Sequence, residues 1–139
     1  MNRSGYYYDI DDFWAHIRWR GAVKSAIRGK RGQAFLREML AAMDAMPSKR
    51  LIAHNLQKGG EVCAIGTIGV ARGIDMAVID VEDYDKVADV FGVSAALVRE
   101  IEYENDDNWH RETPEGRFVR VRQWAKNQLL HTAPAGKQP

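Results

Sequence analysis

The segment after Gly32 carries the pattern that most constrains the fold, a stripe of large apolar residues at the spacing of an α-helix. Its members are Phe35, Leu36, Met39, Leu40, Met43 and Met46. Residues three and four positions apart lie on one helix face, so this stripe has to be buried against other elements. Pro47 is expected to end the helix. A methionine-rich stripe can form an adaptable binding groove, but core packing is the commoner use.

A second amphipathic pattern precedes this stripe and predicts a helix over about 11–28. Its apolar positions form two adjacent stripes, Ile10, Phe13, Trp14 and Ile17, then Trp19, Val23, Ala26 and Ile27. From this region the core is expected to use Trp14, Ile17, Val23 and Ile27. Gly29 is suited to end the helix, and the segment Gly29-Lys30-Arg31-Gly32 is predicted to be a turn.

Residues 62–73 are nearly all small or apolar, and they predict a buried helix in close contact with a neighbour. The internal glycines Gly66 and Gly69 weaken this helix by about 1 kcal/mol each relative to alanine. Just upstream, Gly59-Gly60 lies between two apolar runs, which favours a short β-hairpin around residues 51–65.

Three further helices follow from start and stop signals. A helix over about 81–91 has Asp80 and Asp83 at its start and Gly92 at its end, and Ser94 can cap the next one over about 95–104. Thr113-Pro114-Glu115 is a strong start signal for a last helix that runs to about Leu130. Its inward residues are expected to be Phe118, Val121, Ala125 and Leu129. The chain is therefore predicted to be a mainly α, compact bundle of about five to six helices.

Length and composition indicate one domain. The chain has 139 residues, of which 45% are hydrophobic, enough for one core but not two. Residues 10–131 are predicted to form this domain, with residues 1–9 as a flexible arm and 132–139 as a disordered tail. The single cysteine excludes an intrachain disulfide, and no apolar run approaches the roughly 18 residues of a membrane span. A cytoplasmic protein that does not enter membranes is expected.

The charges are segregated along the chain although the net charge is only +1. Residues 1–60 carry eleven Lys/Arg against five Asp/Glu, residues 61–108 three against twelve, and residues 109–139 six against two. The blocks can neutralise one another across the folded surface, or they can form separate charged surfaces with different partners.

A helix-turn-helix-like pattern occupies residues 84–103. Ala88, Gly92 and Val98 lie where this motif needs a small residue, a tight turn and a buried anchor. The second helix would expose residues in the most acidic third of the chain, namely Ser94, Ala95, Ala96, Arg99, Glu100 and Tyr103. A DNA duplex repels an acidic surface, so a structural corner is favoured over a DNA-reading element.

The first predicted helix and the residues after it carry a dense basic set. Its members are Arg18, Arg20, Lys24, Arg28, Lys30, Arg31 and Arg37, interleaved with Trp14 and Trp19. Positions 20, 24 and 28 lie one turn apart, so they form a positive stripe on one helix face. Such a stripe can bind phosphates or an acidic protein. Neutralisation by the protein's own acidic segment is an equally good interpretation.

Cys63, together with Asn105 and Asp106, is the third candidate site. Cysteine catalysis needs a thiolate that is activated by a nearby base, and the histidines at 16, 54, 110 and 131 show no diagnostic arrangement. A buried structural thiol, with Asn105-Asp106 capping or turning the loop before the last helix, is therefore favoured. No metal spacing, phosphate-binding loop or nucleophile motif occurs, so no metal and no cofactor are expected.

Several segments together resemble a family of small uncharacterised proteins encoded by bacteriophages and prophages. They are residues 2–6, 19–23, 26–36, Val62-Cys63-Ala64-Ile65-Gly66 and Glu112-Thr113-Pro114-Glu115. The Cys-Ala-x-Gly segment with a later Asn-Asp is similar to a wider set of phage proteins. The resemblance implies a phage context and the cytoplasm of a bacterial host, but no activity, ligand or catalytic residue.

The sequence thus favours a non-enzymatic phage accessory protein that binds a macromolecular partner, such as a host or defence protein. Self-association is compatible with the sequence. The alternative is nucleic-acid binding through the basic stripe of residues 18–37, and the third hypothesis is an enzyme that uses Cys63. The basic region is expected to matter more for function than the acidic segment of residues 80–108.

Overall fold

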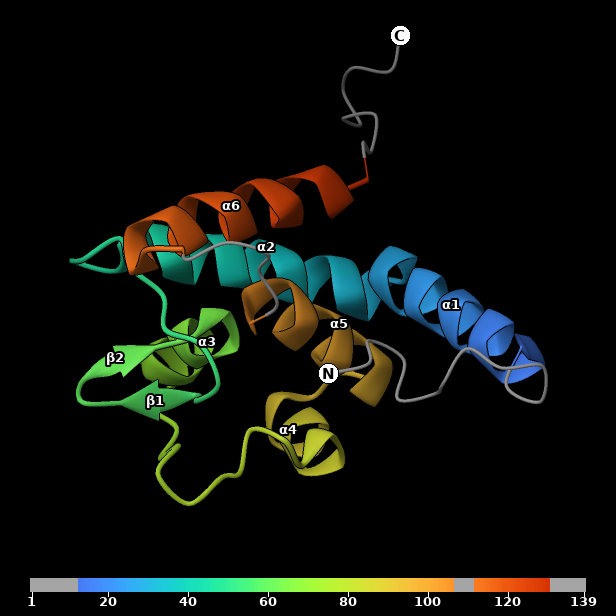
Figure 1. The fold of residues 1–139 in the computed structure, drawn as a ribbon, viewed down its shortest axis with the longest axis horizontal. Coiled ribbons are helices and arrows are strands. Elements are labelled where there is room, and N and C mark those ends of the chain that lie inside the picture. Colours follow the sequence, from blue (N-terminus) through green and yellow to red (C-terminus); the bar gives the residue numbers. More distant parts are fainter. Residues whose placement is uncertain (1–12, 107–111, 131–139) are drawn as a thin grey trace, which may run out of the picture.

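The computed structural model describes residues 13–106 and 112–130 (Figure 1). The arm of residues 1–9 and the tail of residues 132–139 lie outside this range. The described elements are α1 (Phe13–Arg28), α2 (Lys30–Ala45), β1 (Gln57–Lys58), β2 (Glu61–Val62), α3 (Ala64–Arg72), α4 (Tyr84–Phe91), α5 (Ala95–Asp106) and α6 (Pro114–Gln128). The predicted mainly α class with one short hairpin is confirmed.

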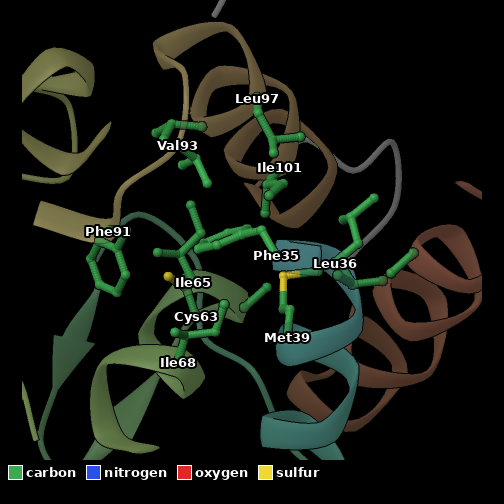
Figure 2. Close-up of a cluster of buried hydrophobic side chains, with 14 of the residues drawn as sticks. Phe35, Leu36, Met39, Cys63, Ile65, Ile68, Phe91, Val93, Leu97 and Ile101 are labelled. Carbon is green, nitrogen blue, oxygen red and sulfur yellow. The ribbon is translucent and has the colours of Figure 1, made fainter. Parts of the chain in front are cut away.

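Helix α2 is the centre of the bundle, and it contacts α1, α3 and α6. Figure 1 shows α6 running back along α2, while α3 and α5 lie on the other side. The apolar face of α2 carries Phe35, Leu36 and Met39, which point toward Ile65 and Ile68 of α3 and toward α5 (Figure 2). Each fully buried side chain of this size stabilises the fold by about 1.5–3 kcal/mol. The methionine-rich stripe is therefore core.

The predicted buried helix and hairpin are both present. Residues 62–69 are buried, and Gly66 lies so close to the neighbouring segment that a Cβ there would be 2.2 Å from the Leu56 carbonyl oxygen. In the hairpin, Lys58 pairs with Glu61. Gly59 and Gly60 supply the positive φ angles of 60° and 82° that a two-residue turn of this kind requires.

Local capping signals set most helix starts. The hydroxyl of Ser94 accepts a hydrogen bond from the Leu97 amide at 3.2 Å, and the hydroxyl of Thr113 accepts one from Gly116 at 2.9 Å. These two predicted caps are confirmed. The predicted start of α4 near residue 81 is wrong, because Asp83 caps the helix through the Lys86 amide.

The predicted turn over residues 29–32 is also wrong. Gly29 alone separates α1 from α2, and Lys30, Arg31 and Gly32 form the first turn of α2. The two helices can meet this abruptly because Gly32 has no side chain. A Cβ at Gly32 would lie 1.8 Å from the carbonyl oxygen of Ala26.

Two residues that the sequence places in the core are exposed. Trp14 is 65% exposed and Ile17 is 40% exposed, whereas Val23 and Ile27 further along α1 are buried. Figure 1 shows the reason, because the first half of α1 projects beyond the other helices. Helical spacing identifies an apolar face correctly, but it does not show how far a neighbouring element extends along that face.

Candidate functional site

A groove of about 510 Å³ opens between α1, the buried side of α5 and the C-terminal end of α6. One wall carries Arg20, Lys24 and Arg28, which follow one another by one helical turn along α1. The rest of the lining is mixed, with the apolar residues Val23, Ile27, Leu129 and Leu130 and the polar residues Asn127 and Gln128. The groove therefore combines a row of positive charges with apolar and polar surface.

The structure separates the seven predicted basic residues into two groups. Arg20, Lys24 and Arg28 line the groove, whereas the other four do not. All seven are exposed, the second group being Arg18, Lys30, Arg31 and Arg37. Among the ion pairs of residues 13–106 and 112–130, none involves any of the seven.

The acidic block finds its ion-pair partners elsewhere. Glu61 lies 3.0 Å from Arg50, and Glu104 lies 3.6 Å from Arg120. Among the described residues, Glu100 is the only acidic side chain of the groove lining, and it is 7% exposed. Neutralisation of the basic stripe by the protein's own acidic segment thus has little support among the described residues, because a single carboxylate faces three cations.

Trp19 is the aromatic residue of the groove. Its ring is tilted against that of His16, with 5.6 Å between the ring centroids. Its indole Nε1 is buried and donates no hydrogen bond to any described residue. A buried donor that lacks an acceptor costs about 1–3 kcal/mol.

The helix-turn-helix-like corner of residues 84–103 is formed. Gly92 has a φ of 75° and ends α4, and α5 starts after Ser94. However, α5 contacts α1, α3, α4 and α6, so most of its surface is covered. Glu100, which was expected to be exposed on a reading helix, is buried. These contacts support the interpretation of this motif as a structural corner.

The structure brings Cys63 and Asn105 together beside the start of α3. The Cys63 thiol is completely buried, accepts a hydrogen bond from the Gly66 amide at 3.4 Å and donates to Oε2 of Glu102 at 3.7 Å. Burial raises the pKa of this thiol well above its usual value, and the nearby Glu102 carboxyl raises it further. The expectation that Cys63 is buried is confirmed, and its structural role stays a prediction.

Asn105 has a different role from the one predicted. Its Oδ1 accepts a hydrogen bond from the Ala64 amide at 2.9 Å, and its Nδ2 donates to the Ile52 carbonyl at 2.8 Å. The side chain therefore caps α3 and holds the segment around Ile52 in place. It does not turn the loop before α6. Asn105 lies in the last turn of α5, from which it reaches back into the core.

Asp106 lies beside Asn105, on the side nearer to solvent. Its Oδ1 accepts hydrogen bonds from Nδ2 of Asn105 at 2.9 Å and from the His54 amide at 3.0 Å. His54 has a positive φ of 69°, and the Asp106 contact helps to hold this strained backbone. Sequence reasoning did not connect His54 with Asp106.

Arg117 is a second residue that sequence reasoning missed. Its guanidinium is buried and donates to the backbone carbonyls of Asn105 at 2.8 Å and Leu51 at 3.2 Å. Glu112 lies 3.7 Å from Nε of Arg117. A signal existed, because residue 117 shares the helical face of Val121 and Ala125. The cluster of Cys63, Glu102, Asn105, Asp106 and Arg117 is hereafter called the polar core.

Other site types find no support in residues 13–106 and 112–130. This part of the chain contains no group of three or more histidine, cysteine, aspartate or glutamate residues that could hold a metal ion. Within the same part, no helix is long and apolar enough to span a bilayer. No protein family, curated protein or solved structure shows a match to this chain.

The polar core makes a pH-dependent prediction. Glu102 is 1% exposed, and its pKa is raised well above the usual value by burial and then by the negative charge of Asp106. The folded state keeps the Glu102 carboxyl protonated, whereas the unfolded state releases that proton above about pH 4.3. The free energy of unfolding therefore falls as pH rises, by about 1.4 kcal/mol per pH unit, until the pKa of Glu102 in the folded state is reached. Glu102→Gln should remove this loss.

Urea unfolding of wild type and Glu102→Gln between about pH 5 and 8 checks the prediction. The stability of the variant relative to wild type is expected to grow with pH. Glu82→Gln, which changes an exposed carboxylate outside the core, serves as the control and should follow wild type. If the free energy of unfolding of wild type and of Glu102→Gln depended on pH in the same way, Glu102 would be ionised in the folded protein.

Proposed function

We propose that this chain is a non-enzymatic phage or prophage accessory protein, and that it binds a negatively charged partner protein through the groove on α1. The observation that carries the proposal is the set of three cations, Arg20, Lys24 and Arg28, that line the groove without an ion pair to any described residue. The phage context rests on the sequence resemblance alone. A host or defence protein is the proposed kind of partner.

The repulsion between these three positive charges supports a binding role for them. Like charges one helical turn apart destabilise a helix by about 0.2–0.5 kcal/mol per pair, and α1 carries two such pairs along its groove face. The core uses the apolar residues Val23 and Ile27 of this helix, so folding does not require the cations. A partner with negative charge would relieve the repulsion when it binds.

The two alternatives are less well supported by the geometry. A nucleic acid could contact the same cations, but the corner that would read bases is covered by neighbouring helices. An enzyme that uses Cys63 would need a thiolate, and the raised pKa of this buried thiol favours the neutral form.

The proposal predicts that the charges on the groove, and not basic charge in general, determine binding. The groove variant replaces Arg20, Lys24 and Arg28 with Gln, and the matched control replaces Lys30, Arg31 and Arg37 with Gln. Both remove three positive charges from exposed positions. Immobilised wild type and control should retain the same protein from a host lysate, whereas the groove variant should lose at least about tenfold in retained partner.

Two further readouts make this test decisive. Nuclease treatment of the lysate should leave the capture unchanged, and loss of capture on treatment would favour nucleic acid as the partner. Thermal unfolding of the groove variant should stay within about 4 °C of wild type, since exposed charges contribute little to stability. Equal capture by all three proteins would refute the proposed groove.

A further inference from the structure

We infer that two copies of this chain associate head to tail, with the cation row of α1 in one copy against an acidic surface around α4 in the other. The acidic surface consists of the exposed residues Asp75, Asp80, Glu82, Asp83, Asp85 and Asp89. The inference goes beyond the proposed function, because it assigns a role to the acidic surface and names a second copy of this chain as a partner of α1.

The acidic surface carries charge that the chain itself does not compensate. None of its carboxylates forms an ion pair with a described residue. Asp75, Asp80 and Asp83 each accept a hydrogen bond from a nearby backbone amide, which leaves their negative charge in place. Residues 75–89 contain six acidic residues and one cation, Lys86, so their net charge is −5.

The two surfaces match in spacing as well as in sign. Arg20, Lys24 and Arg28 follow one another by one helical turn, which is about 6 Å along α1. Asp85 and Asp89 have the same separation along α4, and both are exposed. When α4 of one copy lies along α1 of another, two successive carboxylates can therefore face two successive cations. This contact also relieves the repulsion between the like charges on each helix.

Each surface also has an exposed apolar side chain beside its charges. Ile17 lies three residues before Arg20, on the same face of α1, and is 40% exposed. Val78 lies between Asp75 and Asp80 and is 82% exposed. Burial of these side chains against a second copy removes apolar area from water, which favours association.

The described part of one molecule does not bring its own two surfaces together. Helix α5 packs against both α1 and α4. Figure 1 shows the first half of α1 projecting at one end of the molecule, with α4 and residues 73–83 below α5. The contact is therefore between copies, and the net charge of +1 for the whole chain opposes their approach only weakly. Because the two surfaces differ, each docked copy still offers its other surface, so association continues into a chain or closes into a ring.

Sedimentation velocity of wild type and two charge variants tests the inference. The groove variant removes the α1 row, and the acidic variant replaces Glu82 with Gln and both Asp85 and Asp89 with Asn. The acidic variant leaves the capping residue Asp83 in place. Wild type should associate at about 0.05 M salt, and its association constant should fall at least about tenfold at about 0.5 M salt, because salt screens the charges. Both variants should stay monomeric where wild type associates.

A mixture of the two variants tests the head-to-tail arrangement. The groove variant keeps its acidic surface and the acidic variant keeps its α1 row, so an equimolar mixture should form a one-to-one complex that grows no further. The matched control, which lacks Lys30, Arg31 and Arg37, should associate as wild type does. Val78→Ser should weaken association by about threefold. Circular dichroism should show unchanged helix content in all variants.

Several results would overturn the inference. Wild type that stays monomeric at low salt, or association that salt does not weaken, would do so. Self-association of the acidic variant would show that α1 contacts a different surface, and a mixture of the two variants that stays monomeric would exclude the contact. The proposed function would still stand after any of these results if wild type and the acidic variant captured a lysate protein that the groove variant did not.

Discussion

Asn105→Ala is expected to lower the free energy of unfolding by about 4 kcal/mol, which is a large part of the stability of a domain of this size. The side chain joins three parts of the chain that lie far apart in sequence. It accepts from the Ala64 amide at the start of α3 and donates to the Ile52 carbonyl and to Asp106. Alanine would leave a buried amide and a carbonyl without their partners and would open a cavity beside Cys63.

Thermal and urea unfolding measure this effect, and the melting temperature should fall by about 10 °C or more. Asn127→Ala is the matched control, because Asn127 is exposed on α6 and makes only a surface hydrogen bond to Gln123. The control should stay within about 0.5 kcal/mol of wild type. Equal stability of Asn105→Ala and the control would show that Asn105 does not hold the polar core together.

Gly32→Ala should destabilise the protein by about 3 kcal/mol and should also weaken partner binding. The added Cβ would lie 1.8 Å from the Ala26 carbonyl oxygen and 3.1 Å from that of Ile27. Both contacts are to backbone, so α1 has to move away from α2 as a whole. Because α1 carries the cations of the groove, this movement changes the groove as well as the core.

Gly21→Ala provides the comparison for this substitution within α1. A Cβ at Gly21 meets nothing within 4 Å, so alanine should stabilise the helix by up to about 1 kcal/mol. Unfolding experiments on the two variants should therefore give effects of opposite sign. If Gly32→Ala were as stable as wild type, the close contact between α1 and α2 would be wrong.

The helices and the hairpin could be predicted because their signals are local. Ser94, Thr113 and Gly59-Gly60 act on residues only a few positions away, so their roles can be inferred without a tertiary structure. The same reasoning failed for α4, where Asp80 and Asp83 are both good caps. The structure uses Asp83, while Asp80 accepts from the Glu82 amide in the preceding turn.

The parts of the site that depend on tertiary contacts could be predicted only in outline. The row at positions 20, 24 and 28 follows from helical periodicity, but its separation from Lys30 and Arg31 follows from the abrupt junction of α1 and α2. Asn105 acts on a residue 41 positions away. No local pattern shows such a contact.

Composition also did not show whether the basic and acidic segments of the chain neutralise each other. Counting acidic and basic residues could not show whether the blocks meet, because that depends on the packing of α1 against α5. Within residues 13–106 and 112–130, the structure places a single acidic side chain, Glu100, in the lining of the basic groove. The remaining imbalance is the basis for the proposed binding function.

The central claim is that the groove on α1 is the binding surface, and a map of backbone amide chemical shifts tests it most directly. Isotope-labelled protein would be titrated with a synthetic glutamate-rich peptide, which supplies the negative charge of the proposed partner. The account predicts saturable shifts concentrated in residues 19–28 and 127–130. Shifts concentrated in α4, or the absence of saturable shifts, would contradict it.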